Sequence, residues 1–157
     1  MGFDLYGISP KENTKKPIEV TKYQDEDGWG KWSEMTSGQK DEYFKYKDIY
    51  EEENPGVYFR NNVWWWYPLW KFIVLYCDNI LSDKDIRSGT YNNGHIISKT
   101  KSKRIASRLR RLLKEGVVDT YIAQYEKENK ESSYTFDRSN VVEFEKFCEQ
   151  SGGFQIW

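Results

Sequence analysis

Apolar residues recur every three or four positions in five stretches of the chain, which is the spacing of amphipathic helices. These stretches are residues 38–53, 67–80, 99–115, 117–127 and 140–151. We expect Ser37 and Ser139 to cap the first and the last, because a serine oxygen accepts a hydrogen bond from a free N–H group of the first turn. Gly116 and the pair Gly152–Gly153 mark helix ends. Pro68 suits the first turn of its helix, where the missing N–H costs nothing.

Residues 3–8 alternate between apolar and other side chains, which predicts a first strand. Short β-prone runs at 57–60, 134–136 and 154–157 predict further strands. The Asn-Gly step in residues 91–97 favours positive φ and indicates a tight turn, with a hairpin as one form of it. We therefore predict an α+β fold in which about five helices pack with one small sheet of short strands. The first and last strands are expected to be neighbours.

The composition adds to this prediction of the fold. Aromatic residues make up 17% of the 157-residue chain, so we predict an aromatic-rich core in a single domain over residues 1–157. Residues 10–36 are polar and are expected to be irregular or loop-rich. Mean hydropathy is −0.89, and there is neither an apolar run of about 18 residues nor a secretion signal at the N-terminus. We expect a cytoplasmic protein with no membrane partner.

Charge is balanced overall, with a net charge of −1 and a pI near 6.0, but it is unevenly distributed. Residues 99–114 hold eight basic residues and no acid, whereas residues 41–53 hold six acids and two lysines. Arg104, Arg108 and Arg111 share one face of the predicted basic helix, a stripe suited to an anionic partner. The alternatives are solvation, or pairing with the acidic helix of this chain or of a second copy in a homo-oligomer. The acidic pI argues against non-specific binding to duplex nucleic acid.

Aromatic residues are most concentrated in residues 54–70, NPGVYFRNNVWWWYPLW. Seven of these seventeen residues are aromatic and none is acidic. The consecutive indoles Trp64, Trp65 and Trp66 cannot all enter one core. On a strand they alternate between two faces, and on a helix they spread over about 200°. At least one of them must therefore meet a second surface.

Arg60, Asn61 and Asn62 lie just before these indoles. Arginine binds phosphate or carboxylate through a planar fork, amides bond base edges, and aromatic rings stack on nucleobases. Together with the three tryptophans they predict a pocket for a nucleotide-like ligand. In the structural alternative, the two asparagines hold a turn or cap a helix and Arg60 packs on an indole ring.

Tyr91, Asn93 and His95 are the candidate residues of the predicted turn. His95 is the only histidine, and histidine is the commonest general acid–base, but no partner stands at a recognised catalytic spacing. An ordinary turn is the alternative to a place in the same pocket as Arg60. Cys77 and Cys148 lie in apolar helical patterns and are expected to be buried thiols. With one histidine and no nucleotide-binding or zinc motif, we expect no metal and no cofactor, and an enzyme is unsupported.

Several segments together resemble a family of uncharacterised proteins carried by bacteriophages and by bacteria with prophages. They are MGFDLYG, NPGVYFRNNVWWW, the YNNGH turn and the closing SGGFQIW, so the resemblance spans nearly the whole chain. Some relatives carry a cysteine-rich, zinc-ribbon-like insert near the C-terminus. This chain has only residues 126–133 there, so no metal role of that insert is expected. The resemblance implies a phage-associated role in the cytoplasm of an infected bacterium, without an activity.

These observations give three hypotheses. The first is a phage-type antagonist of a host defence that sequesters a nucleotide-like ligand in the aromatic, arginine and asparagine pocket. The second is an inhibitor that binds a host defence protein, such as a nuclease or effector, through an aromatic surface patch. The third is an enzyme acting on a nucleotide. A purely structural role for the rings remains a fourth interpretation.

Overall fold

The computed structural model describes all residues 1–157, and they form two compact units. The larger unit consists of Met1–Lys11 and Pro55–Trp157, and the smaller one of Glu12–Asn54. The single domain predicted for residues 1–157 stays a prediction, because compactness does not measure cooperative unfolding.

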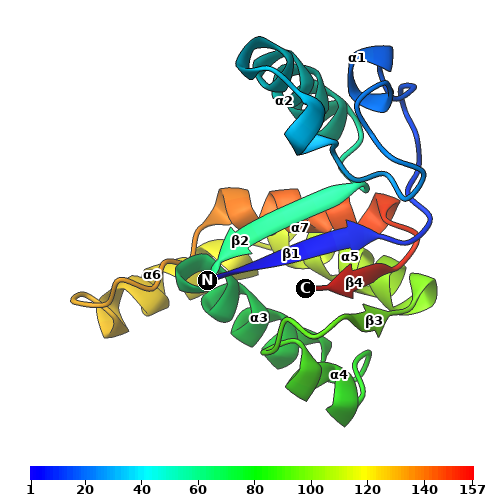
Figure 1. Ribbon diagram of the computed structural model, residues 1–157. Coiled ribbons are helices and arrows are strands. Elements are labelled where there is room, and N and C mark those ends of the chain that lie inside the picture. The colour runs from blue at the N-terminus through cyan, green and yellow to red at the C-terminus, as the bar shows by residue number, and fades with distance from the viewer. The chain divides into compact units, whose positions relative to one another are not determined.

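The larger unit is a four-stranded antiparallel sheet with its helices on one face (Figure 1). Its strands are β1 (Gly2–Gly7), β2 (Tyr58–Asn62), β3 (His95–Ile97) and β4 (Phe154–Ile156), in the order β2-β1-β4-β3. Its helices are α3 (Val63–Cys77), α4 (Asp83–Ser88), α5 (Lys99–Lys114), α6 (Val117–Glu128) and α7 (Arg138–Gln150). This confirms the predicted α+β class, and the pairing of β1 with β4 confirms the predicted neighbours.

The inner face of the sheet is apolar because side chains alternate along each strand. Phe3 and Leu5 of β1 are buried, while Asp4 and Tyr6 between and beside them lie on the other face. Trp66 of α3 is fully buried and stacks on Phe3, with ring centroids 5.3 Å apart. Its indole N–H donates to the Gly89 carbonyl at 2.7 Å, so the one polar atom of this ring is satisfied. The aromatic-rich core is therefore confirmed.

Helix α3 begins earlier than the sequence pattern indicated. Strand β2 ends at Asn62, whose side chain accepts a hydrogen bond from Trp65 N at 3.2 Å and caps the helix without an intervening loop. Pro68 therefore lies inside the helix and not in its first turn, which corrects our expectation. Its missing N–H leaves the Trp64 carbonyl without a helical partner. Thr135 N donates to that carbonyl at 2.9 Å.

Four smaller expectations were also wrong. Thr36 and Asp137 cap their helices in place of Ser37 and Ser139, because their side chains accept from the third N–H of the helix. Residues 134–136 form no strand, since Thr135 bonds to a helix carbonyl and not to a neighbouring strand. Gly94 has a φ of 81°, as the Asn-Gly step indicated, but residues 91–97 form no hairpin, because β3 pairs with the C-terminal strand β4.

The smaller unit contains α1 (Ile18–Thr21), the 3₁₀ turn η1 (Trp32–Glu34) and the long helix α2 (Ser37–Glu53). Val20, Met35 and Tyr43 form its small core. Asn54 is buried and joins the two ends of the unit: its oxygen accepts from Asn13 N at 2.6 Å, and its nitrogen donates to the Tyr50 carbonyl at 2.7 Å. Outside α1, η1 and an isolated antiparallel bridge between Gln24 and Gly30, residues 10–36 are turns and irregular backbone.

We expect Pro68→Ala to loosen the segment that contains Thr135. Alanine supplies an N–H that can reach the Trp64 carbonyl, so the Thr135 N–H loses its exclusive acceptor. Amide hydrogen exchange followed by NMR should show faster exchange at Thr135 without global unfolding. Pro17→Ala, in the smaller unit, is the matched control. Unchanged exchange at Thr135 in Pro68→Ala would contradict this account of the helix.

Candidate functional site

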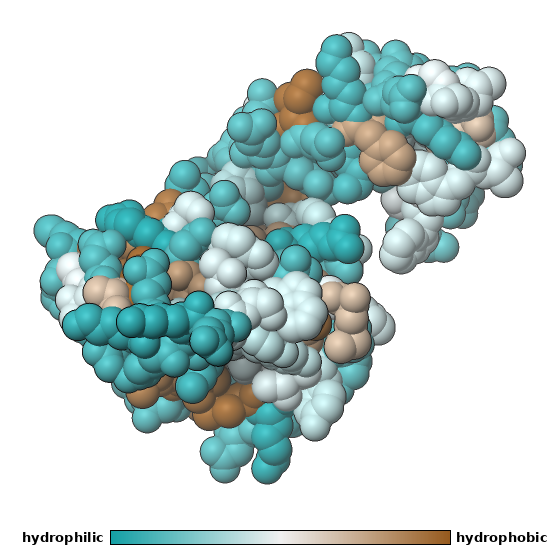
Figure 2. All heavy atoms as spheres, turned by 90° about the vertical axis from the view of Figure 1, so that its left-hand side faces the viewer, coloured by the Kyte–Doolittle hydropathy of each residue, from teal (hydrophilic) through white to brown (hydrophobic).

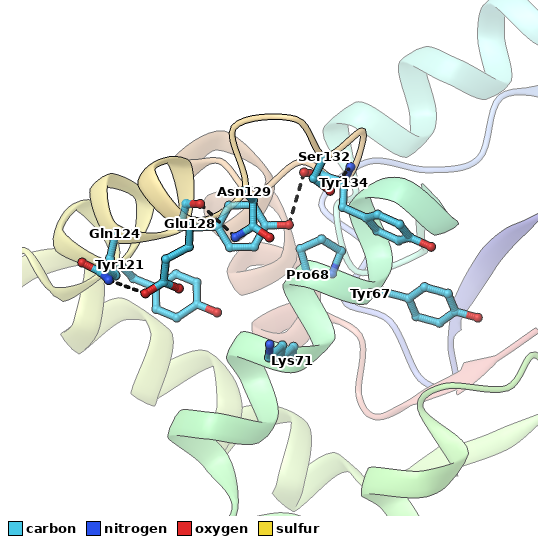
Figure 3. Close-up of a pocket in the computed structure, with 10 residues that line it drawn as sticks. Tyr67, Pro68, Lys71, Tyr121, Gln124, Glu128, Asn129, Ser132 and Tyr134 are labelled. Carbon is cyan, nitrogen blue, oxygen red and sulfur yellow. Dashed lines mark hydrogen bonds between the residues drawn. The ribbon is translucent and has the colours of Figure 1, made fainter.

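A pocket of about 240 Å³ lies between α3, α6 and the segment after α6 (Figure 3). Its walls come from α3 (Tyr67, Pro68, Lys71), from α6 (Tyr121, Gln124, Tyr125, Glu128) and from the following segment (Asn129, Ser132, Tyr134). Four tyrosines, one cation and one carboxylate therefore share one small space. Figure 2 views the larger unit from the side of α6 and shows pale side chains of intermediate hydropathy among hydrophilic ones.

The rim formed by residues 129–135 is positioned by hydrogen bonds at both of its ends. Asn129 Nδ2 donates to the Tyr125 carbonyl at 2.9 Å, which closes the C-terminus of α6. Thr135 N donates to the Trp64 carbonyl that Pro68 leaves free. Between these two anchors the chain brings Ser132 and Tyr134 over α3. The proline in α3 thus contributes to the pocket twice, as part of its wall and through the carbonyl that it frees.

The tyrosine rings are held by the aromatic core behind them. Tyr121 contacts Phe72 and Phe136, with both centroid distances 4.8 Å. Tyr125 donates its hydroxyl to the Tyr134 carbonyl at 3.2 Å. Burial raises the pKa of the Tyr121 hydroxyl, with the neighbouring tyrosines adding to the shift, so this ring stays neutral at physiological pH. The pocket therefore presents fixed, uncharged ring surfaces.

Lys71 and Glu128 are the charged groups of the pocket, and they come from different helices (Figure 3). Lys71 is exposed and makes no hydrogen bond or ion pair within the chain. Glu128 accepts a hydrogen bond from Gln124 Nε2 through one of its two carboxylate oxygens. The pocket can therefore offer an unpaired cation from α3 and a carboxylate from α6 to the same ligand.

Two further hollows lie along α6. One, of about 370 Å³, shares Tyr125, Asn129, Ser132 and Tyr134 with the pocket and so continues it beneath the loop. The other, also about 370 Å³, lies at the start of the helix and includes Tyr121. A ligand larger than one ring system can therefore extend beyond the pocket in either direction along the helix.

None of the nine residues predicted to bind the ligand lines this pocket. Arg60 projects from the uncovered face of the sheet and pairs with Asp4 at 3.5 Å, so it does not pack on an indole ring. Asn61 exchanges two side-chain hydrogen bonds with Asn140 of α7, at 3.0 and 2.7 Å. Asn62 caps α3. The two asparagines therefore have the structural roles weighed as an alternative, and a ligand role for the three residues stays a prediction.

The three consecutive indoles diverge as their helical spacing requires. Trp66 is buried, Trp65 is half-buried and Trp64 is 45% exposed. The Trp64 ring meets the Tyr134 ring edge-on at 5.1 Å, which places it directly beside the pocket rim. The second surface that we expected for one indole is thus, in part, the tyrosine of this rim.

His95 belongs to a second polar cluster, around the buried carboxylate of Asp85. His95 Nε2 lies 2.8 Å from one Asp85 oxygen, while Lys101 Nζ and the Ser82 hydroxyl both contact the other. Burial alone would raise the pKa of Asp85, but these hydrogen bonds hold it well below its usual range. The cluster ties α4, β3 and α5 together. Tyr91 and Asn93 are exposed in the preceding loop.

One of the three arginines in the basic stripe, Arg108, forms hydrogen bonds within the larger unit. Arg108 donates to the Tyr76 carbonyl and to Asn79 Oδ1. Arg110, from the same helix, pairs with Glu145 of α7 at 2.5 Å. Arg104 and Arg111 are exposed and have no partner within the chain. Only these two residues of the predicted trio remain free for an anionic partner, which stays a prediction.

The two cysteines are buried and unbonded to each other. Burial raises the pKa of the Cys77 thiol to about 11, and that of Cys148 is raised well above its ordinary value for the same reason, so both are inert as nucleophiles. No three His, Cys, Asp or Glu side chains converge on a metal-sized site. None of the helices combines the length and the apolar character needed to cross a bilayer.

Neither a family model, a curated protein nor a solved structure matches the chain. Its function must therefore be argued from its own residues. Sequence reasoning missed Lys71, Tyr121, Tyr125 and Tyr134. The signal was present in part, since Tyr121 and Tyr125 are four positions apart and so share one side of the predicted helix 117–127, but nothing local shows that they face Lys71.

We expect Asp85→Asn to lower the free energy of unfolding by about 2–4 kcal/mol near neutral pH, because it leaves Lys101 and His95 without their charged partner. The unfolded state takes up the Asp85 proton near pH 3.9, whereas the folded state takes it up only at lower pH. The contribution is therefore present above about pH 4 and is lost as the pH falls through the lower, folded pKa.

Urea unfolding between about pH 6 and about pH 3 measures this effect. The wild type should lose stability on acidification more steeply than Asp85→Asn, so the difference between them shrinks. Asp119→Asn, which removes an exposed pair with Arg138, is the control and should change stability by less than about 1 kcal/mol. A difference between wild type and Asp85→Asn that does not depend on pH would count against the assigned role.

Proposed function

We propose that this protein is a phage-type antagonist of a bacterial host defence that acts by binding, and that it sequesters a nucleotide-like ligand in the tyrosine pocket. Two observations support the proposal. The resemblance of MGFDLYG, NPGVYFRNNVWWW and SGGFQIW to a phage and prophage family suggests the biological setting. The pocket between α3 and α6 suggests the ligand class.

The observation that carries the ligand class is an unpaired lysine among aromatic rings. Stacking of a base on an aromatic side chain contributes about 1–3 kcal/mol, and the pocket offers tyrosine rings from both sides. Lys71 is a flexible point charge of the kind that binds phosphate, and no acid of the chain neutralises it. A molecule with a flat ring and an anionic group satisfies both features.

Binding is favoured over turnover because the reactive groups of the chain are engaged elsewhere. His95 Nε2 is committed to Asp85, and the two thiols are buried. The pocket itself contains no histidine and no cysteine. A ligand that is recovered chemically unchanged would agree with sequestration, whereas a product would point to the enzyme of the third hypothesis.

We expect Lys71→Gln to weaken nucleotide binding about tenfold without lowering stability, because the removed charge has no partner in the fold. The ligand is identified by mass spectrometry of material released from the denatured protein, and its affinity is measured by calorimetry. Lys146→Gln is the control, because Lys146 on α7 is also exposed and has no partner in the chain. Equal affinities of the two variants, or no response to any nucleotide by a folded sample, would refute the proposal.

The second candidate is an inhibitor of a host defence protein that binds through the uncovered face of the sheet. Aromatic residues and arginine are enriched at binding hot spots, and this face exposes Tyr6, Arg60 and Trp157. The ring centroids of Tyr6 and Tyr58, on neighbouring strands, lie 5.2 Å apart, and this pair widens the aromatic surface. No helix of the larger unit covers it (Figure 1).

A stoichiometric complex with a host protein that is lost in Trp157→Ala but kept in Lys71→Gln would favour this second candidate. Truncation of a central aromatic residue typically costs about 2 kcal/mol or more at a hot spot, roughly a thirtyfold loss of affinity. Pull-down followed by calorimetry with the purified partner measures it. If Trp157→Ala retains full affinity, the sheet face is not the binding surface.

A further inference from the structure

The hollow that adjoins the tyrosine pocket contains the same kinds of groups as the pocket itself. Its walls come from the end of α6 and the segment that follows, and they include Glu126, Lys130 and Phe136. Tyr125 and Tyr134 line both the pocket and this hollow. The two spaces are therefore neighbours that share tyrosine rings.

Each space also has one cation and one carboxylate. In the pocket they are Lys71 and Glu128 (Figure 3), and in the hollow they are Lys130 and Glu126. Lys130 is exposed and makes no hydrogen bond or ion pair within the chain, which is also true of Lys71. Glu126 is exposed and unpaired as well. This repeated set of groups points to a ligand with two similar halves, one for each space.

A nucleotide unit carries a group that matches each member of the set. Its phosphate is an anion for the lysine, and its base is a flat ring that stacks on tyrosine. Its ribose hydroxyls can donate hydrogen bonds to a carboxylate, which is how an acidic residue holds the ribose in dinucleotide-binding folds. The two carboxylates are therefore compatible with an anionic ligand whose phosphates lie at the two lysines.

The volumes of the two spaces agree with two units. The pocket, at about 240 Å³, is below the usual range of about 300–1,000 Å³ for a drug-sized ligand, so it suits one ring system. The hollow beside it has a volume of about 370 Å³. A mononucleotide that stacks in the pocket with its phosphate on Lys71 leaves the hollow and Lys130 unused. A second unit linked to the first occupies both.

We infer that the tyrosine pocket and the adjoining hollow together bind two linked nucleotide units, one in each space, with Lys71 and Lys130 each holding a phosphate. This inference rests on the proposed nucleotide-binding function, and it adds the size of the ligand and a second binding residue, Lys130. The two units can belong to a free dinucleotide or to adjacent residues of a single-stranded nucleic acid, because both present the same groups.

Calorimetric titration of the full chain tests the inference with 5′-mononucleotides of the four bases and with the 5′-phosphorylated dinucleotide of each base. The matching nucleoside diphosphates are the charge control, since they add a phosphate without a second base. We expect each dinucleotide that binds to do so about tenfold or more tightly than the mononucleotide and the diphosphate of its base, because it adds a stacked ring and a second lysine contact. Equal affinity would overturn the two-unit site and leave the proposed function standing. Failure of all of them to bind would overturn both.

Lys130→Gln is the decisive variant, because it removes the cation of the hollow and leaves the pocket intact. It should lower dinucleotide affinity about tenfold and leave the affinity of the pocket for a mononucleotide unchanged, whereas Lys71→Gln should weaken both. Lys127→Gln is the control and should behave as wild type, because Lys127 is an exposed lysine of α6 that lines neither space. Dinucleotide affinity that is unchanged in Lys130→Gln would refute the inference.

An octanucleotide distinguishes the two sources of the linked units. Affinity at least equal to that of the dinucleotide would assign the units to a nucleic-acid strand that continues beyond both spaces. Weaker affinity would assign them to a free dinucleotide whose ends lie within the spaces. Either result agrees with a two-unit site only if Lys130→Gln weakens the tighter of the two ligands.

Discussion

Trp66 is the contact on which the larger unit depends. Its ring stacks on Phe3 of β1 and on Trp70 of its own helix, meets Phe144 of α7 edge-on, and donates its N–H to the Gly89 carbonyl that follows α4. One fully buried side chain therefore links the sheet with three helices. Because an unpaired buried N–H costs about 1–3 kcal/mol, the bond to Gly89 preserves the stabilisation that burial of the ring provides.

The pocket depends on a departure from regular helix structure at Pro68, two residues after this anchor in α3. A proline inside a helix normally costs stability, because a carbonyl one turn earlier loses its donor. Here that carbonyl belongs to Trp64, and the backbone N–H of Thr135 replaces the missing donor. The loop after α6 is thereby fixed to α3. The Trp64 carbonyl that Pro68 leaves free is therefore the point at which the pocket rim attaches to α3.

The basic residues of the larger unit differ in whether they have an acidic partner within the chain. Two basic residues of α5 form ion pairs with acids of the larger unit, Lys101 with Asp85 and Arg110 with Glu145. Lys71 has no such partner, although it stands on the most apolar helix of the chain. A single unpaired cation beside aromatic rings is a more selective anion site than a basic stripe, since the rings restrict what can approach it.

The sequence by itself determined the elements and their class: the periodicity predicted five long helices and the strands β1 and β4, because these patterns depend on neighbouring residues. It also required the indoles of residues 64–66 to diverge. Only the tertiary structure decided which indole is buried, that Asn61 pairs with Asn140, and that Lys71 shares a pocket with residues 121–134. The reason is physical, because a side chain can bond only to groups that folding brings close to it. The partners of Asn61 and Lys71 lie about fifty or more residues away in the sequence.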